Sequence, residues 1–481
     1  MSVLVVDVGT SGLRAAVVDG GGAVHALEHR PFLPATPFPG LVEFDGTAMA
    51  AAVLDVAGRS LAAAGPVEAV GISNQRASTL VWDRGTGQPI GPGLGWQDLR
   101  TVFDCITAKA EHGLALAPNQ SATKVAWLLN NIAGARDRDL CFGTVDTWVA
   151  WVLSGGAVHV TDPSNAAVTG LLNADTTAWS SEACSALGVP IEMLPAMVDS
   201  TGVFGQASAL AGSPPLAALI GDQQSSLVGQ GCVLPGLAKI TFGTGGMFDV
   251  CTGARAPSTA RRSEHGTFPI VAWSQAGQRT WGAEAIMLSA GTNVDWLRDD
   301  LGIIETSAHS HDVAAQCQHT DGVVFVPALM GLGTPHWDYG ARGTLLGLTR
   351  GSGRPQLVRA VLEGIAQRGA DLLEAAEADF GASIGALRVD GGMSQNPTFI
   401  QALANATGRP IEVSPQTEAT TIGAAYLAGL AVGVWGSFDD IAAAWRPRVV
   451  VEPTERLDRQ QWAAAIERAR GWIPDLSALD F

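Results

Sequence analysis

The chain opens with two apolar runs that a glycine-rich turn separates. Val3–Val6 and Arg14–Asp19 predict two strands, and Asp7–Gly12 between them predicts a tight turn. Gly20–Gly22 predicts a second turn that leads into a third strand near Ala23–His29. Because strands joined by short glycine-rich turns are usually antiparallel neighbours, the pattern predicts a hairpin at the start of the chain.

The same pattern returns about 235 residues later, near the middle of the chain. Ala238–Phe242 is an apolar run, Gly243–Gly246 is a glycine-rich turn, and Met247–Cys251 is a second apolar run. Both hairpins carry a Gly-Thr pair at the tip. Two short matches prove no duplication, but two related lobes that each open with a hairpin would produce them.

Strands and helices alternate along the rest of the chain. Apolar runs predict strands at Val67–Ser73, Leu80–Asp83, Gly322–Ala328 and Leu387–Asp390. Amphipathic segments predict helices at Thr123–Ile132, Thr147–Leu153, Pro355–Ala378 and Asn396–Ala406. This alternation indicates an α/β fold with helices on both faces of the sheets. We predict two lobes, residues 1–229 and 230–481, with the boundary in the proline-containing stretch Leu216–Leu237.

Length and composition narrow the class of protein. A chain of 481 residues exceeds what one hydrophobic core usually serves. Its 47% apolar and 16% charged residues exclude a disordered chain, a coiled coil and a disulfide miniprotein. The net charge of −17 disfavours nucleic acid and anionic membranes as partners.

Targeting signals and cysteines suggest a cytoplasmic protein. No signal peptide is visible, and the longest apolar stretch, around Ala424–Trp435, is shorter than the roughly 18 residues of a membrane helix. The six cysteines form no CxxC pair and show no metal-ligand spacing to histidine. We therefore expect buried free thiols in a reducing compartment.

Three glycine-rich segments are candidate phosphate sites, because glycine lets backbone N–H groups approach an anion. Asp7–Arg14 adds hydroxyls, a carboxylate and a cation, although such a turn alone is more often only a hairpin. Its second copy at Gly243–Gly246 strengthens the phosphate interpretation. Arg388–Asn396 runs from a strand through Gly-Gly into a helix, whose N-terminus suits a phosphate; a plain β–α turn is the alternative. The chain lacks the P-loop and GxGxxG motifs, so neither of those nucleotide-binding folds fits.

Asp222 follows an apolar run that predicts a buried strand. A carboxylate at that position could accept the proton of a hydroxyl that attacks a γ-phosphate. It could equally cap the helix that the following Gln-Gln-Ser-Ser-Leu run predicts. The local sequence leaves both interpretations open.

The order of these segments resembles that of the FGGY family of carbohydrate kinases, and within it most of all the glycerol kinases. The resemblance covers nearly the whole chain and includes Gly71–Arg76, Phe142–Trp148, Val158–Asp162, Glu192–Pro195, Arg342–Gly351 and Gly423–Gly433. It implies two actin-like (ribonuclease H-like) ATPase lobes with a nucleotide cleft between them. It also implies ATP-dependent phosphorylation of a hydroxyl on a small polyol or sugar.

The resemblance further implies ATP and Mg²⁺ as cofactors. Asp7 would hold Mg²⁺ through water, and Asp222 would be the general base. The residues implied for ATP binding are Thr10, Ser11, Gly12, Arg14, Thr244, Gly245, Gly291, Asp295, Gly392 and Asn396. Asp295 stands where the glycerol kinases usually have glutamine.

The residues that the resemblance implies for the substrate are Arg76, Ala77, Trp96, Asn119, Asp222, Gln223 and Met247. Ala77 replaces a glutamate, Asn119 a tyrosine and Met247 a phenylalanine of the glycerol kinases. A hydrogen bond to a charged carboxylate contributes about 1.5–3 kcal/mol, so the missing glutamate should weaken glycerol binding roughly tenfold to a hundredfold. Two changes remove volume and the third introduces a flexible side chain. We therefore expect a wider pocket and a four- to six-carbon polyol or ketose, with a true glycerol kinase as the alternative.

Two non-enzymatic classes compete with the kinase interpretation. One is a nucleotide-binding structural switch of the actin type, and the other is a degenerate kinase that senses sugar. The presence of Asp7, Arg14, Thr244 and Asp222 favours an enzyme, because a scaffold needs no catalytic base. Members of the family are often oligomers, so a homodimer or homotetramer is expected.

Overall fold

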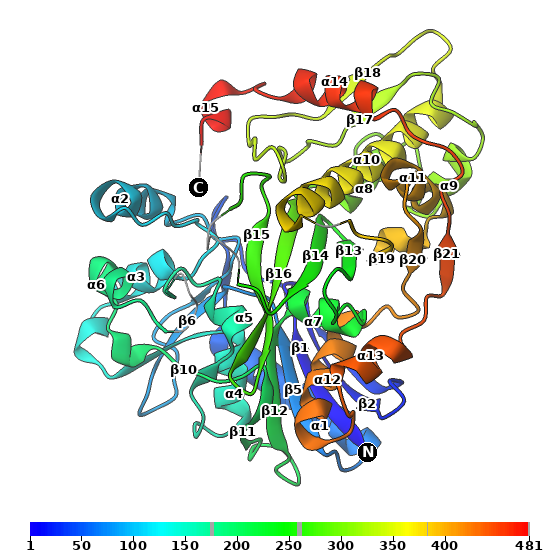
Figure 1. Cartoon of the computed structure of the whole chain (residues 1–481). Helices are drawn as coiled ribbons and strands as arrows, with labels where there is room; N and C mark the ends of the chain where they lie inside the picture. Colours follow the sequence, from blue (N-terminus) through cyan, green and yellow to red (C-terminus); the bar gives the residue numbers. More distant parts are fainter. Residues whose placement is uncertain (174–177, 257–261, 382, 480–481) are drawn as a thin grey trace.

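The first half of the chain is built on a six-stranded mixed sheet (Figure 1). The computed structural model describes residues 1–481 except 174–177, 257–261, 382 and 480–481. The strand order is β11-β12-β5-β1-β2-β3. The bounds are β1 (Ser2–Val8), β2 (Gly12–Asp19), β3 (Val24–Pro31), β5 (Ala69–Asn74), β11 (Thr201–Gln206) and β12 (Pro215–Gly221). Strands β1, β5 and β12 are parallel, and the others are antiparallel to their neighbours.

The second half repeats this sheet and adds one strand. The order is β15-β16-β14-β13-β19-β20-β21. The bounds are β13 (Ala238–Phe242), β14 (Gly246–Gly253), β15 (Phe268–Gln275), β16 (Gln278–Met287), β19 (Leu387–Asp390), β20 (Ile411–Val413) and β21 (Val449–Val451). Across the second sheet, the strands β16-β14-β13-β19-β20-β21 correspond one for one to β3-β2-β1-β5-β12-β11 of the first sheet. Neighbouring strands are parallel or antiparallel in the same way in both sheets. The prediction of two related lobes that each open with a hairpin is confirmed.

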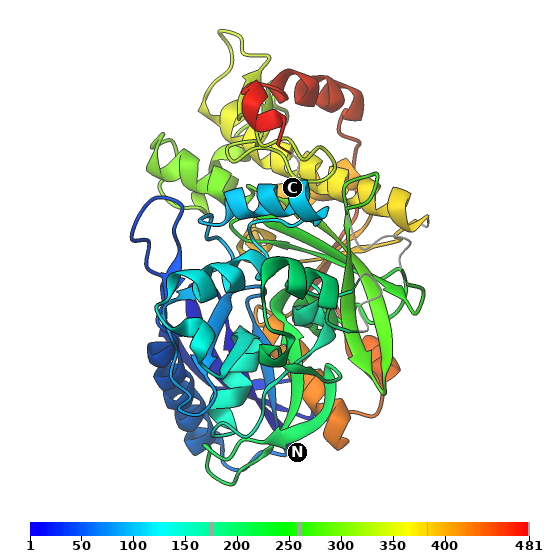
Figure 2. The same ribbon diagram turned by 90° about the vertical axis from the view of Figure 1, so that its left-hand side faces the viewer.

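Helices cover both faces of the two sheets (Figures 1 and 2). The longer ones are α1 (Gly46–Ala64), α2 (Val102–His112), α3 (Ala122–Asn131), α4 (Val145–Leu153), α7 (Asp222–Gly229), α8 (Gly291–Asp299), α10 (Arg354–Phe380), α11 (Pro397–Thr407), α12 (Ala419–Val432) and α14 (Arg459–Ala469). Shorter ones are α5 (Pro163–Ala166), α6 (Ser181–Leu187), α9 (His309–Ala314), α13 (Phe438–Ala444) and α15 (Pro474–Ser477). The four helices predicted from the sequence are confirmed, with ends that differ by at most two residues.

Smaller sheets complete the fold. The four-stranded sheet comprises β4 (Glu43–Phe44), β7 (Gly93–Leu94), β6 (Thr79–Asp83) and β8 (Leu140–Thr144). The two-stranded sheets pair β9 (Val160–Thr161) with β10 (Ala196–Met197), and β17 (Val324–Val326) with β18 (Thr344–Leu346). The strand predicted at Gly322–Ala328 is thus shorter than expected.

The continuous apolar runs of the central strands follow from this layering. Val3 and Val5 of β1 belong to the core that contains α12, whereas Leu4 and Val6 belong to the core that contains α1 and α4. Successive side chains of a strand point to opposite faces, so a strand covered on both sides must be apolar throughout.

Helix α12 belongs to the second half of the chain but packs on the sheet of the first half, against β12, β5, β1 and β11. It also crosses α7 closely (Figure 1). A Cβ atom on Gly423 would lie 1.8 Å from the carbonyl oxygen of Ser225, and one on Gly229 would lie 1.9 Å from that of Ala419. The two lobes therefore share this helix pair, and the boundary at residues 229 and 230 stays a prediction.

Two expectations about the sequence can be compared with the structure. All six cysteines are free, as predicted; five are buried and Cys317 is half-buried. Among the described residues, α1 is the one helix with the length and apolar composition of a membrane span. Met49, Val53 and Val56 on one face of α1 are buried in the core of the first lobe, as in a core helix.

Candidate active site

The site lies where the carboxyl ends of parallel strands meet. Strand register pairs Asp7 of β1 with Ser73 of β5, and Asn74 of β5 with Gly221 of β12. The loops that follow these strands carry Arg76 and Asp222. Ligands of open α/β sheets bind at this edge. Three predicted site residues that are distant in sequence, Asp7, Arg76 and Asp222, are thus brought together.

Asp222 is the first residue of α7, and Gly221 occupies the N-cap position. The capping interpretation of Asp222 is therefore wrong. Its side chain is 29% exposed, and Oδ1 lies 3.7 Å from Nε of Arg76. Burial raises the pKa of Asp222, and the positive charge of Arg76 counteracts that rise. A partly exposed carboxylate whose pKa is raised suits proton acceptance.

Asp7 is buried and lies 3.7 Å from Nε of Arg14. Burial raises the pKa of Asp7 to about 7; Arg14 opposes the rise, and the charges of Asp222 and Glu418 add to it. Arg14 also pairs with Glu418, just before α12. A buried carboxylate near a second carboxylate is a suitable oxygen environment for Mg²⁺, so Asp7 fits the predicted ion.

The first glycine-rich hairpin contacts Trp96, one of the residues predicted for the substrate. The N–H of Gly9 donates to the carbonyl of Gly12 (2.9 Å), which closes the turn. Nε1 of Trp96 donates to Oγ1 of Thr10 (3.1 Å), and Ser11 is exposed. Gly12 has no room for a side chain, because a Cβ atom would lie 2.8 Å from Nε2 of His29.

The second glycine-rich hairpin is held by the start of α8. The N–H of Ala290 donates to the carbonyl of Thr244 and the N–H of Gly291 to that of Gly243, both at 2.9 Å. The amide of Gly291 is thus used inside the protein, while Thr244 is exposed. Asp295, one turn further along α8, pairs with Arg298 at 3.1 Å.

The third glycine segment leaves open space beside the cleft. Gly391 has φ 84°, and a Cβ atom there would lie 2.4 Å from the carbonyl of Phe242. Nothing lies within 4 Å of a Cβ atom on Gly392, so the space directly beside it is open. Asn396 caps α11 by accepting from the N–H of Phe399, and it donates to Ser310. Its side chain therefore has a structural role in capping α11, and its contact with ATP stays a prediction.

The residues predicted for the substrate lie on several loops, at the start of α7 and on one strand of the second sheet. Ala77 is buried with φ 62°, and its carbonyl accepts from the hydroxyl of Ser121. Trp96 is 38% exposed and Asn119 is exposed. Met247 lies on β14, opposite Ile286 of β16. Ala77 has no carboxylate, so the position that follows Arg76 in the chain provides no acidic group.

Sequence reasoning missed Lys124, which connects the two loops that carry the predicted substrate residues Trp96 and Asn119. Its buried ammonium donates to the carbonyls of Gly95 (2.8 Å), Trp96 (3.2 Å) and Asn119 (3.4 Å). Burial lowers the pKa of Lys124 to about 7. A single lysine in an amphipathic helix gives no sequence signal of such a role.

A row of charged residues from the second lobe was also missed. Strand register aligns Lys239 of β13 with Asp249 of β14, and Asp249 with Glu284 of β16. Nζ of Lys239 lies 2.7 Å from Oδ2 of Asp249, and both side chains are fully buried. Nζ of Lys239 also donates to Oε1 of Gln223 (3.0 Å), and Glu284 binds Arg76. The signal in the sequence was the presence of a charged residue among the apolar residues of each of three strands, which indicates that these charges pair with one another.

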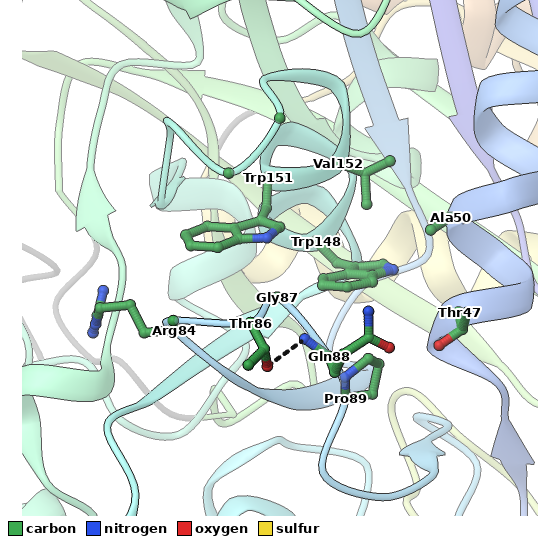
Figure 3. A pocket seen from close by; sticks show the side chains of 13 residues that line it. Thr47, Ala50, Arg84, Thr86, Gly87, Gln88, Pro89, Trp148, Trp151 and Val152 are labelled. Carbon is green, nitrogen blue, oxygen red and sulfur yellow. Dashed lines mark hydrogen bonds between the residues drawn. The ribbon is translucent and has the colours of Figure 1, made fainter.

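A hollow of about 460 Å³ lies at the other end of β6. Ala77 precedes this strand, whereas residues 84–89, which line the hollow, follow it. Trp148, Trp151, Thr47 and Gln88 line part of it (Figure 3). Its lining contains no acidic residue and no histidine. It therefore offers no acid or base for the reaction.

Two actin-like lobes with paired phosphate hairpins and a carboxylate in the cleft define an ATP-dependent kinase that acts on a hydroxyl group. The models of the FGGY family of carbohydrate kinases match residues 2–229 (N-terminal domain) and 238–432 (C-terminal domain). The chain belongs to this family, as its sequence motifs predicted.

Curated relatives and solved structures agree with the family. Glycerol kinases from Aromatoleum aromaticum and Deinococcus radiodurans are 41% and 40% identical to the chain, over 98% and 99% of it and 99% of each relative. The structure of Plasmodium falciparum glycerol kinase with ADP has a TM-score of 0.90 at 27% identity, covering 97% of this chain and 98% of that one. Xylulose kinase from Lactobacillus acidophilus has a TM-score of 0.83 at 21% identity, covering 97% and 96%, and shows the shared fold alone.

Proposed function

We propose that the chain transfers the γ-phosphoryl group of ATP to a hydroxyl of a small uncharged polyol, and that this polyol is glycerol. The observation that carries the proposal is the position of Asp222 beside Arg76, with the neighbouring Gln223 bonded to Lys239 of the other lobe. Names of relatives at about 41% identity favour glycerol over the longer substrate expected from the sequence.

In this proposal Asp222 accepts the proton of the attacking hydroxyl. Its raised pKa brings the base closer to neutral pH, where general-base catalysis is efficient. The two hairpins hold the phosphates with backbone N–H groups and with the hydroxyls of Thr10 and Thr244. Asp7 would hold Mg²⁺, which would supply positive charge to offset that of the phosphates. Contact between the lobes excludes water and so protects ATP from hydrolysis.

The charges around Arg76 favour an uncharged substrate over a sugar acid. Arg76 pairs with Glu284 and lies near Asp222, and Lys239 pairs with Asp249. Both cations are therefore already in contact with carboxylates, and three carboxylates surround two cations. A substrate carboxylate would meet a surplus of negative charge, which repels it.

A longer polyol or ketose is the second candidate, because of position 77. Ala77 provides no carboxylate to bind a glycerol hydroxyl, and Asn119 and Met247 leave more space than tyrosine and phenylalanine. These three residues are the specific observation that favours the longer substrate.

The experiment is ADP release from Mg²⁺-ATP with glycerol, tetritols, pentitols, hexitols, the matching ketoses and gluconate. We expect the highest kcat/KM with glycerol. A longer polyol or ketose in first place would replace glycerol by the second candidate. Gluconate in first place would contradict the charge argument, and no turnover with any acceptor would refute the kinase proposal.

The pocket is tested separately by Ala77→Glu combined with Asn119→Tyr. If these positions face the substrate, the added carboxylate should improve glycerol kcat/KM about tenfold to a hundredfold. Unchanged glycerol turnover would show that the two positions do not face the acceptor.

A further inference from the structure

The guanidinium of Arg76 connects the two lobes. The side chain is 13% exposed, and Nη2 donates to Oε2 of Glu284 at 2.6 Å. Arg76 follows β5 of the first sheet, whereas Glu284 lies on β16 of the second sheet, 208 residues further along the chain. On the other side, Nε of Arg76 faces Asp222 at 3.7 Å. The third nitrogen, Nη1, is buried and has no hydrogen-bond partner among the described residues.

An unpartnered buried donor is costly, so a ligand group at Nη1 would stabilise it. Nη1 lies on the same rigid fork as the nitrogens that face Glu284 and Asp222. The direction in which Nη1 points is therefore fixed by the partner that holds Nη2.

Glu284 is available for Arg76 because its own neighbour is already paired. In the row across the second sheet, Asp249 separates Glu284 from Lys239 and pairs with Lys239 at 2.7 Å. Glu284 is only 7% exposed, so water cannot replace Arg76 as its partner. Removal of one partner from a buried charged pair costs more free energy than the intact pair contributes, because the remaining charge is left buried without a partner.

The two carboxylates around Arg76 are not equivalent. Its contact with Glu284 has the length of a charge-assisted hydrogen bond, whereas its distance to Asp222 exceeds one. Arg76 is thus held by Glu284 and leaves Asp222 available to accept a proton. Without Glu284, Asp222 would become the nearest carboxylate partner of the guanidinium.

We propose that Glu284 is a positioning residue of the proposed kinase reaction: it holds Arg76 from the opposite lobe, and so determines how tightly the polyol binds. The proposal rests on the proposed function, because the polyol is what Arg76 contacts. It also makes the substrate site complete only when the two lobes are in contact.

The test is Glu284→Gln, with the KM for the polyol, the KM for ATP and kcat measured separately. We expect the polyol KM to rise about tenfold or more, because a charge-assisted bond is replaced by a weaker neutral one. The ATP KM should stay within about twofold, since the side-chain hydrogen bond of Glu284 is with Arg76 and not with the turn residues Gly243–Gly246. An unchanged polyol KM would overturn the proposal.

A pH profile adds a readout that a purely structural role would not change. The charged groups that face Arg76 are Glu284, Asp222 and Asp249, and Lys239 also acts on Glu284. Burial raises the pKa of Glu284 to about 7, against the effect of Arg76. Only the deprotonated form pairs fully with Arg76, so the polyol KM of the unaltered enzyme should fall as pH rises through about 7. Glu284→Gln should abolish that dependence; the same profile in both proteins would contradict the proposal.

A double-mutant cycle with Arg76→Gln tests whether Glu284 acts through Arg76. If it does, adding Glu284→Gln to Arg76→Gln should change the polyol KM less than about twofold. Additive effects would mean that Glu284 acts in another way, and the proposal would fall.

The control is Glu363→Gln on α10. Glu363 bonds Arg359 at 2.7 Å, is 18% exposed, and has a pKa that burial raises, but it lies outside the site. The polyol KM of the Glu363→Gln variant should equal that of the unaltered enzyme. If Glu284→Gln does not fold, Glu284→Asp takes its place, and an intermediate rise in KM supports the proposal while none overturns it. Turnover of the unaltered enzyme is measured first, so a failure of the proposed function is recognised before any variant is compared.

Discussion

The crossing of α7 and α12 makes the effect of Gly423→Ala predictable. The added Cβ atom would lie 1.8 Å from the carbonyl oxygen of Ser225 and 2.9 Å from the amide nitrogen of Gly229. Both neighbours are helix backbone and cannot rotate away. The two helices must therefore separate by about 1.2 Å or more before the methyl group fits.

The cost follows from what that separation disrupts. A gap of 0.5–1 Å forfeits about a quarter to a half of the attraction between packed atoms. The hydrogen bond from Oγ of Ser225 to the carbonyl of Thr420, at 2.6 Å, contributes about 0.5–1.5 kcal/mol and would weaken. Alanine returns about 1 kcal/mol of helix propensity. We expect a net decrease in the free energy of unfolding of about 1–3 kcal/mol.

Gly58→Ala is the matched control, because Gly58 also lies inside a helix, α1, and nothing lies within 4 Å of its added Cβ atom. It should stabilise the protein by about 0.5–1 kcal/mol. Urea unfolding followed by circular dichroism measures both variants.

Gly423→Ala should also affect catalysis, because the helix that it displaces, α7, begins with Asp222. A displacement of about 1 Å at the base can lower kcat roughly 10²-fold. A Gly423→Ala protein with the stability and kcat of the unaltered enzyme would refute the close helix crossing, and with it the shared helix pair.

Three further predictions concern single side chains. Asp222→Asn should lower kcat about 10²–10⁴-fold and leave ADP binding by calorimetry within about twofold; a mutant that keeps most of its activity would eliminate Asp222 as the base. Lys124→Met should release the loops that carry Trp96 and Asn119 and raise the polyol KM about tenfold, with the ATP KM as the internal comparison. Burial, together with the charge of a neighbouring aspartate, raises the pKa of Asp146 to about 7 from 3.8, so the folded state keeps a proton that the unfolded state loses above about pH 4. Stability should thus fall as pH rises from about 4 to 7, and less steeply in Asp146→Asn; parallel urea midpoints at pH 5 and 7.5 would contradict this.

The local features of the fold could be predicted from the sequence. Apolar runs and glycine turns predicted both hairpins, and amphipathic periodicity predicted α3, α4, α10 and α11 within two residues. These features depend on residues that are adjacent in the chain, so a short window contains their cause. The order of the motifs was sufficient to predict the family.

The position of α12 could not be predicted in this way. Its sequence shows that it is apolar on all sides and must be buried, but not which sheet covers it. It packs on the sheet of the first half because Gly423 and Gly229 allow the backbones of α12 and α7 to touch.

The sequence by itself determined the two hairpins, their glycine-rich turns and the kinase family, because local backbone preferences and motif order establish them. Only the tertiary structure decided the partners of Arg76. Strand register aligns Lys239, Asp249 and Glu284 across the second sheet, and contact between the lobes brings that row to a residue 208 positions away from Glu284. Electrostatic pairing of this kind depends on distance in space, and distance in sequence carries no information about it.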